Sequence, residues 1–558
     1  MRVIKEITKY APNSIFVSLV FGGLAGVVYT GLIPILLIGI EDLVNANQSG
    51  NTAVVLGIQV SNVALAGLFL ALCFAILIFR VLSQTILLKA SFLFATSFRK
   101  KLYEKVLASK LDKLEDTGSA RLINALTTDI NNIVAGGQSA PVLFINLITI
   151  FGMLMYVWVV NSAVFYFLII ALLIGVVTYQ IPLILAGNYF TRSREWRDKL
   201  QASFEALSYG TKELKVNKTL RQDFFQSELL KAEEKVKDYS TKSNIVYSIT
   251  GNYGEMICFL VIGTVVFAYS NYQQISNSQL ISVVMIMLYL TGPIAALLSA
   301  IPSIMQAAIS YKKLDILYDE LQSEGFAVDV KKQTSWQTLQ LRDVVYQYEK
   351  SPFFVGPVNL SISKGELVFL VGGNGSGKST LSKLTSLFYK PTSGALYFDD
   401  VQVEDANVNG FRQGIFTIFT DYYLFKKIGS IDENDHQEIN EVNRLIADFE
   451  LAHKVEYTGS GFSQTSLSDG QRKRLALISA IYEDKELYLF DEWAADQDPE
   501  FRERFYRHIL PMLRAKNKAV LVVSHDDRFF DVADKLIFME TGQVIEQREH
   551  QHRNLNAS

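Results

Sequence analysis

The sequence is short of charge and of cysteine. Only 20% of its 558 residues are charged, against roughly 25% in an average soluble domain, and the mean hydropathy is +0.20. These values argue against a wholly soluble enzyme and exclude a long disordered chain. A net charge of −3 offers no basic stripe, so we expect no nucleic-acid partner. Both cysteines, Cys73 and Cys258, lie in apolar runs, which excludes a disulfide framework or a cysteine-based zinc site and favours simple burial.

Long apolar runs are confined to the first part of the chain. Each is near or above the ~20 residues that an α-helix needs to cross a bilayer, so core helices of a soluble protein are a poor explanation. The first run is too long for the apolar part of a signal peptide, and we expect it to be retained. The sequence thus predicts six transmembrane helices, over Ser14–Ile40, Val54–Phe79, Pro141–Val160, Ala163–Ala186, Tyr247–Tyr269 and Leu280–Ala300.

Lysine and arginine orient these spans. They gather before the first run and in the long connections after the second and fourth runs. None occurs in the connections Glu41–Ala53, Asn161–Ser162 and Ser270–Gln279. Both termini and both long connections are therefore expected to be cytoplasmic, in a multi-pass protein of the inner membrane.

The two long connections keep an apolar stripe between their charges, over Ala90–Leu111 and Trp196–Leu207. They predict helices that extend the spans into the cytoplasm and turn near Gly118 and Gly210. The tips of these extensions are expected to dock on the C-terminal half of the chain.

The composition changes after Tyr311. Short apolar runs, such as Glu366–Val371 and Ala519–Val523, then alternate with helical stretches, such as Leu381–Phe388, as in a parallel sheet covered by helices. The sequence predicts a membrane α-helical domain at 1–320, a linker at 321–337 and an α/β domain at 338–558.

One glycine-rich segment follows a predicted strand and opens a predicted helix, which is the context of a phosphate-binding loop. Its glycines let backbone N–H groups converge on phosphate oxygens, aided by the helix N-terminus. We expect Lys378 to reach the β- and γ-phosphates of ATP and the Ser379 hydroxyl to bind Mg²⁺. The segment reads Gly372-Gly373-Asn374-Gly375-Ser376-Gly377-Lys378-Ser379-Thr380.

Two acids and a histidine follow other predicted strands. Asp491 and Glu492 end the apolar stretch Leu487–Phe490, and His525 follows Ala519–Ser524. Beside a phosphate loop, Asp491 is expected near Mg²⁺, Glu492 near the attacking water and His525 near the γ-phosphate. Taken singly, such acids are more often a solvated strand end, and a lone histidine is usually structural.

Leu467-Ser468-Asp469-Gly470-Gln471 resembles the signature sequence of ABC ATPases. With the motifs above, the chain resembles an ABC exporter half-transporter, which implies a homodimer with two ATP sites, each joining one subunit's phosphate loop to the other's signature. The resemblance implies that Ser468 and Gly470 contact the γ-phosphate across the dimer. It also implies that Tyr348 stacks on adenine, the alternative being an ordinary strand tyrosine. Gln471 and Asp498 belong to the implied nucleotide site.

Three stretches are similar to the exporters of cyclic peptides and siderophores, including pyoverdine, syringomycin and lasso-peptide microcin exporters. They are Ile418–Phe425, Asp491–Pro499 and Ser524–Asp527. Thr420 departs from the wider family, in which a glutamine senses Mg²⁺ and the γ-phosphate. We expect that contact to pass through water or to be taken over by Asp421.

The resemblance implies alternating access driven by ATP, with Glu492 acting on water. An intramembrane acid, Glu255, is a candidate for contact with a cationic peptide, the alternative being a position near the inner interface or a pair with Arg80. Polar and aromatic residues that could line a cavity are Tyr156, Trp158, Tyr179, Gln180, Tyr253, Tyr289 and Gln306.

A peptide-like secondary metabolite is the expected cargo, with membrane lipids as surroundings. A lipid or drug exporter is the first alternative, since fold does not determine substrate. An ATP-gated regulator is the second, and an intact Glu492 and His525 argue against it. No protease domain precedes the first span, so we do not expect the chain to trim a leader peptide.

Overall fold

The computed structural model describes residues 11–49, 53–55, 58–60, 62–269, 277–324, 336–349, 351–429 and 431–549. Side chains are left out at 41–60, 176, 179–183, 186, 247, 250–251, 254–255, 269 and 277–278. The predicted basic N-terminus, most of the predicted linker and the side chains of Tyr179, Gln180 and Glu255 therefore lie outside the described residues. The chain forms two compact units, Met1–Leu102 with Ala120–Leu317, and Tyr103–Ser119 with Tyr318–Ser558.

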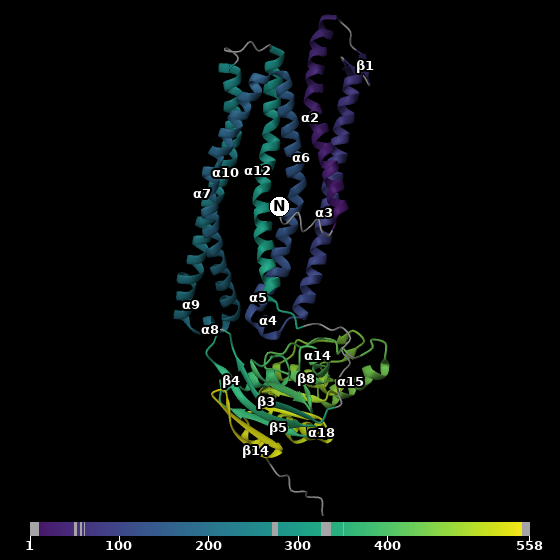
Figure 1. Cartoon of the computed structure of the whole chain (residues 1–558), viewed down its shortest axis with the longest axis vertical. Coiled ribbons are helices and arrows are strands. Elements are labelled where there is room, and N and C mark those ends of the chain that lie inside the picture. The colour runs from purple at the N-terminus through teal and green to yellow at the C-terminus, as the bar shows by residue number, and fades with distance from the viewer. Residues whose placement is uncertain are drawn as a thin grey trace, which may run out of the picture. The chain divides into compact units, whose positions relative to one another are not determined.

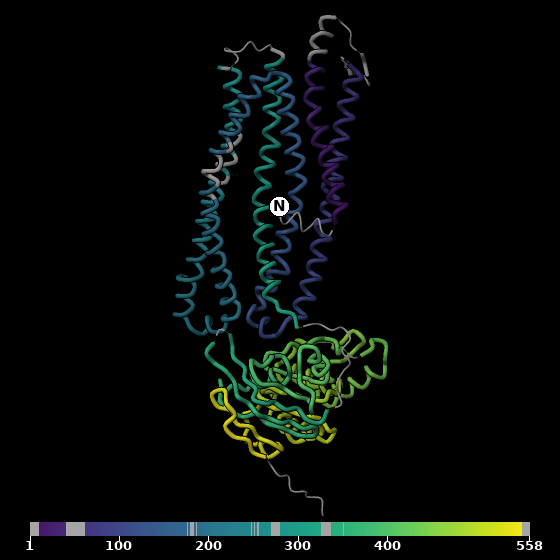
Figure 2. The backbone as a smooth tube through the Cα atoms, viewed as in Figure 1, coloured from purple at the N-terminus to yellow at the C-terminus, as the bar shows by residue number. Residues whose placement is uncertain are grey.

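Long helices carry the apolar runs of the first unit (Figures 1 and 2). They are α2 (Pro12–Ser49), α3 (Val63–Leu107), α6 (Ile130–Val160), α7 (Ser162–Tyr209), α10 (Lys231–Gly263) and α12 (Asn277–Glu320). The shorter elements of the connections are α5 (Ser119–Asn124), η1 (Ala125–Asp129), α8 (Thr211–Val216), α9 (Lys218–Asp223) and η2 (Phe224–Leu230), and η3 (Thr264–Tyr269) continues α10.

The predicted spans agree with these helices, apart from two corrections. The run that begins at Val54 starts with a hairpin of β1 (Ala53–Val55) and β2 (Ile58–Val60), so its helix begins only at Val63. The expected loop from Glu41 is helical up to Ser49. Within the described residues, four helical segments are long and apolar enough to cross a membrane, and two shorter apolar ones lie in α7 and from α10 into η3.

Small and hydroxyl residues join the helices of the first unit. Ser18 of α2 and Ser83 of α3 each donate a hydroxyl hydrogen bond to the other's carbonyl, at 2.7 and 2.8 Å. A Cβ on Gly152 of α6 would lie 2.5 Å from the Thr30 hydroxyl oxygen, so glycine allows α2 and α6 to approach closely. Such contacts are typical of helices packed in lipid, where there is no hydrophobic driving force between them.

Residues that cap the ends of helices lie where the sequence predicts turns. Asn161 accepts hydrogen bonds from the N–H groups of Ala163 and Val164 at the start of α7. The N–H of Gly210 donates to the Ala206 carbonyl at the end of α7. Gly118, at φ +77°, ends α4 (Leu111–Thr117). These positions confirm the turns expected near Gly118 and Gly210.

The second unit is built on two sheets. The larger has the order β14-β13-β5-β12-β11-β8, in which all neighbours are parallel except the edge strand β14. Its strands are β5 (Leu367–Gly372), β8 (Ile415–Ile418), β11 (Leu487–Asp491), β12 (Ala519–Val523), β13 (Lys535–Glu540) and β14 (Gln543–Glu549). The smaller, antiparallel sheet has the order β4-β3-β6-β7, from β3 (Thr338–Gln347), β4 (Phe354–Ser363), β6 (Ser393–Phe398) and β7 (Val401–Gln402).

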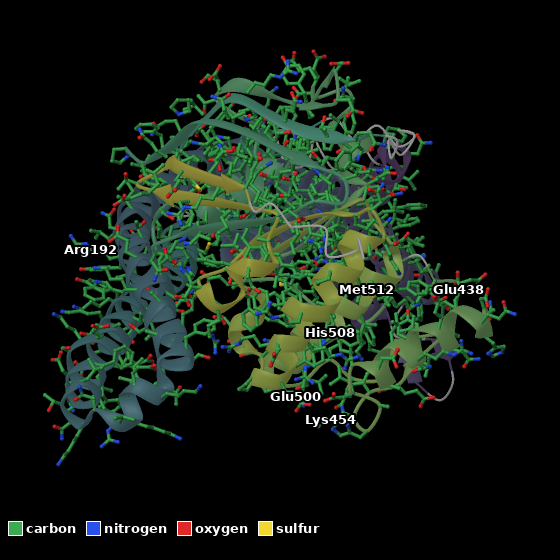
Figure 3. All side chains as sticks on the ribbon, turned by 90° about the horizontal axis from the view of Figure 1, so that it is seen from below. Arg192, Glu438, Lys454, Glu500, His508 and Met512 are labelled. Carbon is green, nitrogen blue, oxygen red and sulfur yellow. The ribbon has the colours of Figure 1, made fainter. Side chains whose placement is uncertain are left out.

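Helices complete this α/β unit, as the alternating pattern predicts. They are α13 (Lys378–Thr385), α14 (Val408–Arg412), α15 (His436–Asp448), α16 (Asp469–Glu483), η4 (Trp493–Asp496), α17 (Pro499–Arg504), η5 (Phe505–Ile509), α18 (Leu510–Ala515) and η6 (Asp527–Val532), beside a small hairpin of β9 (Tyr457–Thr458) and β10 (Gly461–Phe462). Of the residues labelled in Figure 3, Glu500 lies on α17, His508 on η5 and Met512 on α18. The expected helix at Leu381–Phe388 begins earlier, at Lys378, and ends at Thr385.

Two apolar clusters stabilise the unit. One is centred on Phe490, Trp493 and Phe505, and the other, which includes Leu341 and Leu370, contains residues of both sheets. Because β5, β8, β11 and β12 are parallel, their carboxyl ends meet at one edge of the larger sheet, and that edge carries the candidate site.

Candidate nucleotide site

The glycine-rich segment connects β5 to α13 as a tight loop. Gly375 and Gly377 have φ of +77° and +100°, a region that favours glycine. A Cβ on Gly377 would also lie 2.9 Å from a Val355 methyl group. The loop therefore needs glycine both for its conformation and for space.

Lys378 folds back over this loop. Its ammonium group donates hydrogen bonds to the carbonyls of Gly372 and Gly373, at 2.7 and 2.8 Å. Burial lowers the pKa of Lys378, against the attraction of Glu492 and Asp491. The charge thus lies at the mouth of the loop, close to two carboxylates.

The loop has the features of an anion site. The Ser376 hydroxyl is buried and has no hydrogen-bond partner among the described residues. Such an orphaned group is rare in folded proteins, and this one belongs to the glycine-rich loop itself. It fits a site that takes phosphate oxygens as ligands.

The acids predicted to serve the site lie at the end of β11. Asp491 is 2% exposed. The pKa of Asp491 is raised. Burial is the main cause and the charges of Glu492 and Asp421 add to it, whereas a hydrogen bond from Ser379 acts in the opposite direction. A hydroxyl and a carboxylate in contact are oxygen ligands suited to Mg²⁺, which usually keeps few protein ligands and takes the rest from water and phosphate.

Glu492 and His525 meet at the same edge. Glu492 has a left-handed backbone, with φ +47°, which is unusual for a residue with a side chain. Its Oε1 lies 3.1 Å from Nε2 of His525. The two predicted catalytic side chains are therefore in contact, beside the phosphate loop.

Tyr348, just after β3, contacts the phosphate loop from the antiparallel sheet. Its hydroxyl lies 2.8 Å from the Thr380 hydroxyl. Thr420 follows β8, the neighbour of β11, and is exposed, as is Asp421. The charge of Asp421 acts on Asp491, so this loop faces the acidic end of β11.

The signature residues occupy the start of α16. Ser468 is the N-cap residue, and its side chain makes no capping hydrogen bond to that helix. A Cβ on Gly470 would lie 2.6 Å from the Asp496 carbonyl, so glycine is required here. Gln471 follows on α16, and Asp498 caps α17 by accepting from the Phe501 N–H at 2.9 Å.

A buried polar network joins α16 to the loop after Glu492, and sequence reasoning missed it. Lys473 donates to the Glu492 carbonyl at 3.0 Å and pairs with Asp496 at 2.8 Å. Arg474 bonds Gln497 and pairs with Asp498. The available signal was the charged pair Lys473–Arg474 directly before the apolar run Leu475–Ile478, because a helix buries such charges only when they have partners.

The membrane-spanning unit holds an apolar cavity of about 460 Å³ between α6, α7, α10 and α12. The described residues that line it are all uncharged and include Leu154, Leu172, Gly175, Cys258, Leu290 and Leu298. Among the described side chains, none of the predicted Tyr156, Trp158, Tyr253, Tyr289 and Gln306 lines it. Tyr156 and Tyr289 instead pack against an apolar cluster of helices, where Tyr289 contacts Tyr29.

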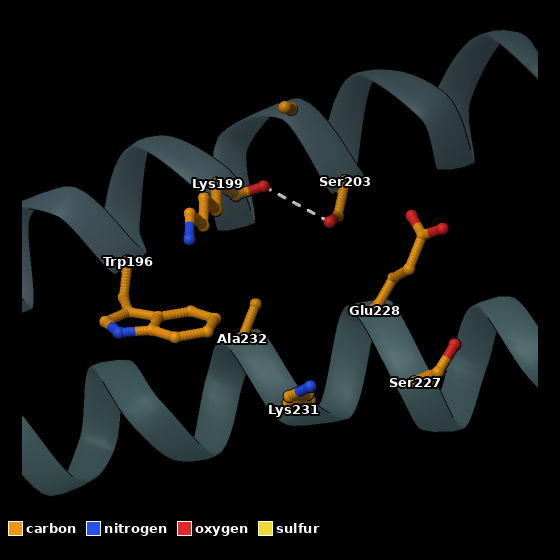
Figure 4. Close-up of a pocket in the computed structure, with 8 residues that line it drawn as sticks. Trp196, Lys199, Ser203, Ser227, Glu228, Lys231 and Ala232 are labelled. Carbon is orange, nitrogen blue, oxygen red and sulfur yellow. Dashed lines mark hydrogen bonds between the residues drawn. The ribbon is translucent and has the colours of Figure 1, made fainter.

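A polar hollow of about 340 Å³ lies between α7 and the η2–α10 segment (Figure 4). The Lys199 ammonium lies 4.3 Å from the Trp196 ring centroid, and the Ser203 hydroxyl donates to the Lys199 carbonyl. Glu228 and Lys231 line the hollow from the opposite helix. Their mixed charges are those of a solvated cleft between two amphipathic helices, and we assign it no ligand.

Comparison with known families agrees with this geometry. Residues 355–495 match the model described as ABC transporter, and residues 15–294 match the ABC transporter transmembrane region. The chain belongs to the ABC transporter family. It is an ABC exporter half-transporter, a multi-pass membrane protein whose ATP hydrolysis is coupled to transport.

The relatives of this exporter carry names that indicate different roles. ATP-binding protein SyrD of Pseudomonas syringae pv. syringae is 32% identical over 86% of this chain and 87% of that protein. The ATP-dependent lipid A-core flippase of Paraburkholderia xenovorans is 23% identical over 81% and 78%. The solved structure of a bacterial Atm1-family ABC exporter with ATP bound has a TM-score of 0.76 at 17% identity, over 96% and 95% of the two chains, and supports the fold alone.

Proposed function

We propose that this ABC exporter moves a peptide-like secondary metabolite (a cyclic peptide, lasso peptide or peptide siderophore) out across the inner membrane as a homodimer. Its termini and long connections then lie in the cytoplasm, with domains at 1–320 and 338–558 and a linker between them. The observation that carries the proposal is the joining, in one chain, of a membrane-spanning unit to a sheet edge bearing Lys378, Asp491 and Glu492.

We assign the following roles at that edge. The loop 372–380 binds the phosphates of ATP, and Ser379 with Asp491 holds Mg²⁺, which would neutralise charge on the phosphates. Glu492 orients or deprotonates the attacking water. His525, held at 3.1 Å from Glu492, contacts the γ-phosphate. Tyr348 stacks on adenine.

The start of α16 supports a composite site with a second copy. Backbone donors at a helix N-terminus attract anions, and the exposed Ser468 hydroxyl makes no capping bond to its own helix. We assign Ser468, Gly470 and Gln471 to the γ-phosphate of the partner's ATP. Asp498 belongs to the same nucleotide site and lies in the loop after Glu492, which contacts α16 through Arg474. Thr420 and Asp421 replace the usual glutamine contact to Mg²⁺.

The apolar cavity bears on the cargo. A peptide backbone placed there would leave N–H and C=O groups without partners, which is costly in a lipid-like environment. The cavity therefore suits the hydrocarbon part of an amphipathic molecule. The relative of Aggregatibacter actinomycetemcomitans named leukotoxin export ATP-binding protein LtxB is 29% identical over 50% of this chain and 40% of that protein, and its name supports the export of a toxin.

The alternative is a lipid or drug exporter, which the similarity to a lipid A-core flippase favours. A comparison of wild-type and Glu492→Gln strains by untargeted mass spectrometry distinguishes the two. Glu492→Gln is expected to bind ATP but nearly abolish turnover. Our proposal is supported if, in the Glu492→Gln strain, a peptide-sized compound is lost from the medium and accumulates in the cells. A change confined to lipid species contradicts it.

Gly175→Leu tests the cavity in the same strains. A Cβ at Gly175 would lie 3.6 Å from an Ile257 methyl carbon, an ordinary contact, so the larger side chain is expected to fill the cavity without disrupting α7. Export should fall while ATP hydrolysis by the purified protein persists. Unchanged export would remove the cavity from the cargo path.

A further inference from the structure

A cluster of tyrosines surrounds the residue assigned to adenine. The ring of Tyr348 makes edge contacts with Tyr346 and Tyr389, with centroids 5.0 and 6.2 Å apart. Tyr346 and Tyr389 stack on each other at 4.6 Å. Aromatic pairs prefer such edge-to-face and stacked geometries. The orientation of Tyr348 therefore depends on where Tyr389 lies.

Tyr389 is held in turn by α4. This helix is the tip of the first long connection between membrane helices, and it belongs to the same compact unit as the tyrosines. The buried Tyr389 hydroxyl donates to Oε2 of Glu115 at 2.5 Å. Oε1 of Glu115 accepts from the Lys383 ammonium at 2.7 Å. Lys383 lies on α13, the helix that begins at Lys378.

A second contact reaches the residue next to Tyr348. The Lys113 ammonium donates to Oε1 of Glu349 at 2.5 Å, and Leu111 packs against the apolar cluster that contains Tyr346. α4 thus contacts the neighbourhood of Tyr348 through two separate side chains, Glu115 and Lys113.

We infer that Glu115 is a positioning residue for the adenine-stacking tyrosine, so that the first membrane connection sets the affinity for the base of ATP. The inference rests on the proposed stacking of Tyr348 on adenine. Docking of α4 alone would need only Leu111 and the Lys383 ion pair, but the Glu115 bond ends on the aromatic cluster itself. Since coupling between sites is reciprocal, binding of the base would also tighten the attachment of α4.

Glu115→Gln tests this in the full chain. Dissociation constants are measured by calorimetry without Mg²⁺, so that ATP is not hydrolysed, for ATP and for tripolyphosphate, which has no base. The variant should weaken ATP binding by roughly fivefold, the lower end of measured couplings, and leave tripolyphosphate unchanged. Tyr389→Phe should reproduce this effect, since it removes only the hydroxyl. Glu433→Gln, in an exposed ion pair with Lys427, is the matched control and should change neither constant.

The double variant Glu115→Gln with Tyr348→Leu separates the inference from the stacking assignment. If Glu115 acts through Tyr348, it has no further effect once the ring is gone. An equal loss for ATP and tripolyphosphate, or an additive loss in the double variant, would overturn the inference. If Tyr348→Leu alone leaves ATP affinity unchanged, the stacking assignment itself fails.

Discussion

Lys473 provides the sharpest test of how the catalytic glutamate is held. Its side chain is only 5% exposed and bonds the Glu492 carbonyl and Asp496. Its own carbonyl accepts from the Trp493 indole N–H at 3.0 Å. The left-handed backbone of Glu492 costs on the order of 1 kcal/mol or more and persists only where its surroundings impose it. Lys473→Met keeps the packing of the aliphatic part of the side chain but removes the charge that holds the Glu492 backbone in this conformation.

The expected loss follows from the contacts. Removing a charged donor from a buried carbonyl costs about 1–3 kcal/mol. The part of this energy that orients Glu492 no longer stabilises the transition state for ATP hydrolysis. At about 1.4 kcal/mol per factor of ten, we expect kcat for ATP to fall roughly five- to 100-fold. The KM for ATP should change much less, because the loop 372–380 is untouched.

Steady-state ATP hydrolysis by the purified full chain measures both constants. Lys473→Arg, which keeps the charge, should recover part of kcat, and Lys427→Met, in an exposed ion pair, should leave it unchanged. A Lys473→Met protein that folds normally and keeps kcat within twofold of wild type would refute the idea that α16 holds Glu492.

Two further predictions concern single side chains. Thr420→Gln should restore the reach of the usual glutamine and change the ATPase rate or its coupling to transport. If both stay at the wild-type level in hydrolysis and transport assays, position 420 is idle. The backbone N–H of Phe501 and the charge of Arg474 lower the pKa of Asp498. The resulting stability is present above the ordinary aspartate pKa, about 3.9, and is lost as the pH falls through the lowered value. Asp498→Asn should therefore flatten the pH dependence of thermal unfolding below about pH 4, and an unchanged profile would contradict this.

Local patterns in the sequence determined much of this protein. Apolar runs, the glycine-rich loop and the acids after β11 each need only neighbours along the chain, because helix length, glycine conformation and strand ends are local properties. The class of fold, the phosphate loop, and the positions of Asp491, Glu492 and His525 at strand ends could therefore be read directly. The hairpin before α3 was missed because an apolar run alone does not distinguish strand from helix.

Contacts between distant segments were decided only by the tertiary structure. Lys473 contacts Glu492 because α16 packs beside the end of β11, and Glu115 contacts Tyr389 although 274 residues separate them along the chain. The cavity of the first unit is likewise formed by residues of four helices, and among the described side chains none of the polar and aromatic residues suggested from the sequence lines it. A sequence carries no local signal for such pairs, since what selects them is the burial of charge and apolar surface when separate elements pack together.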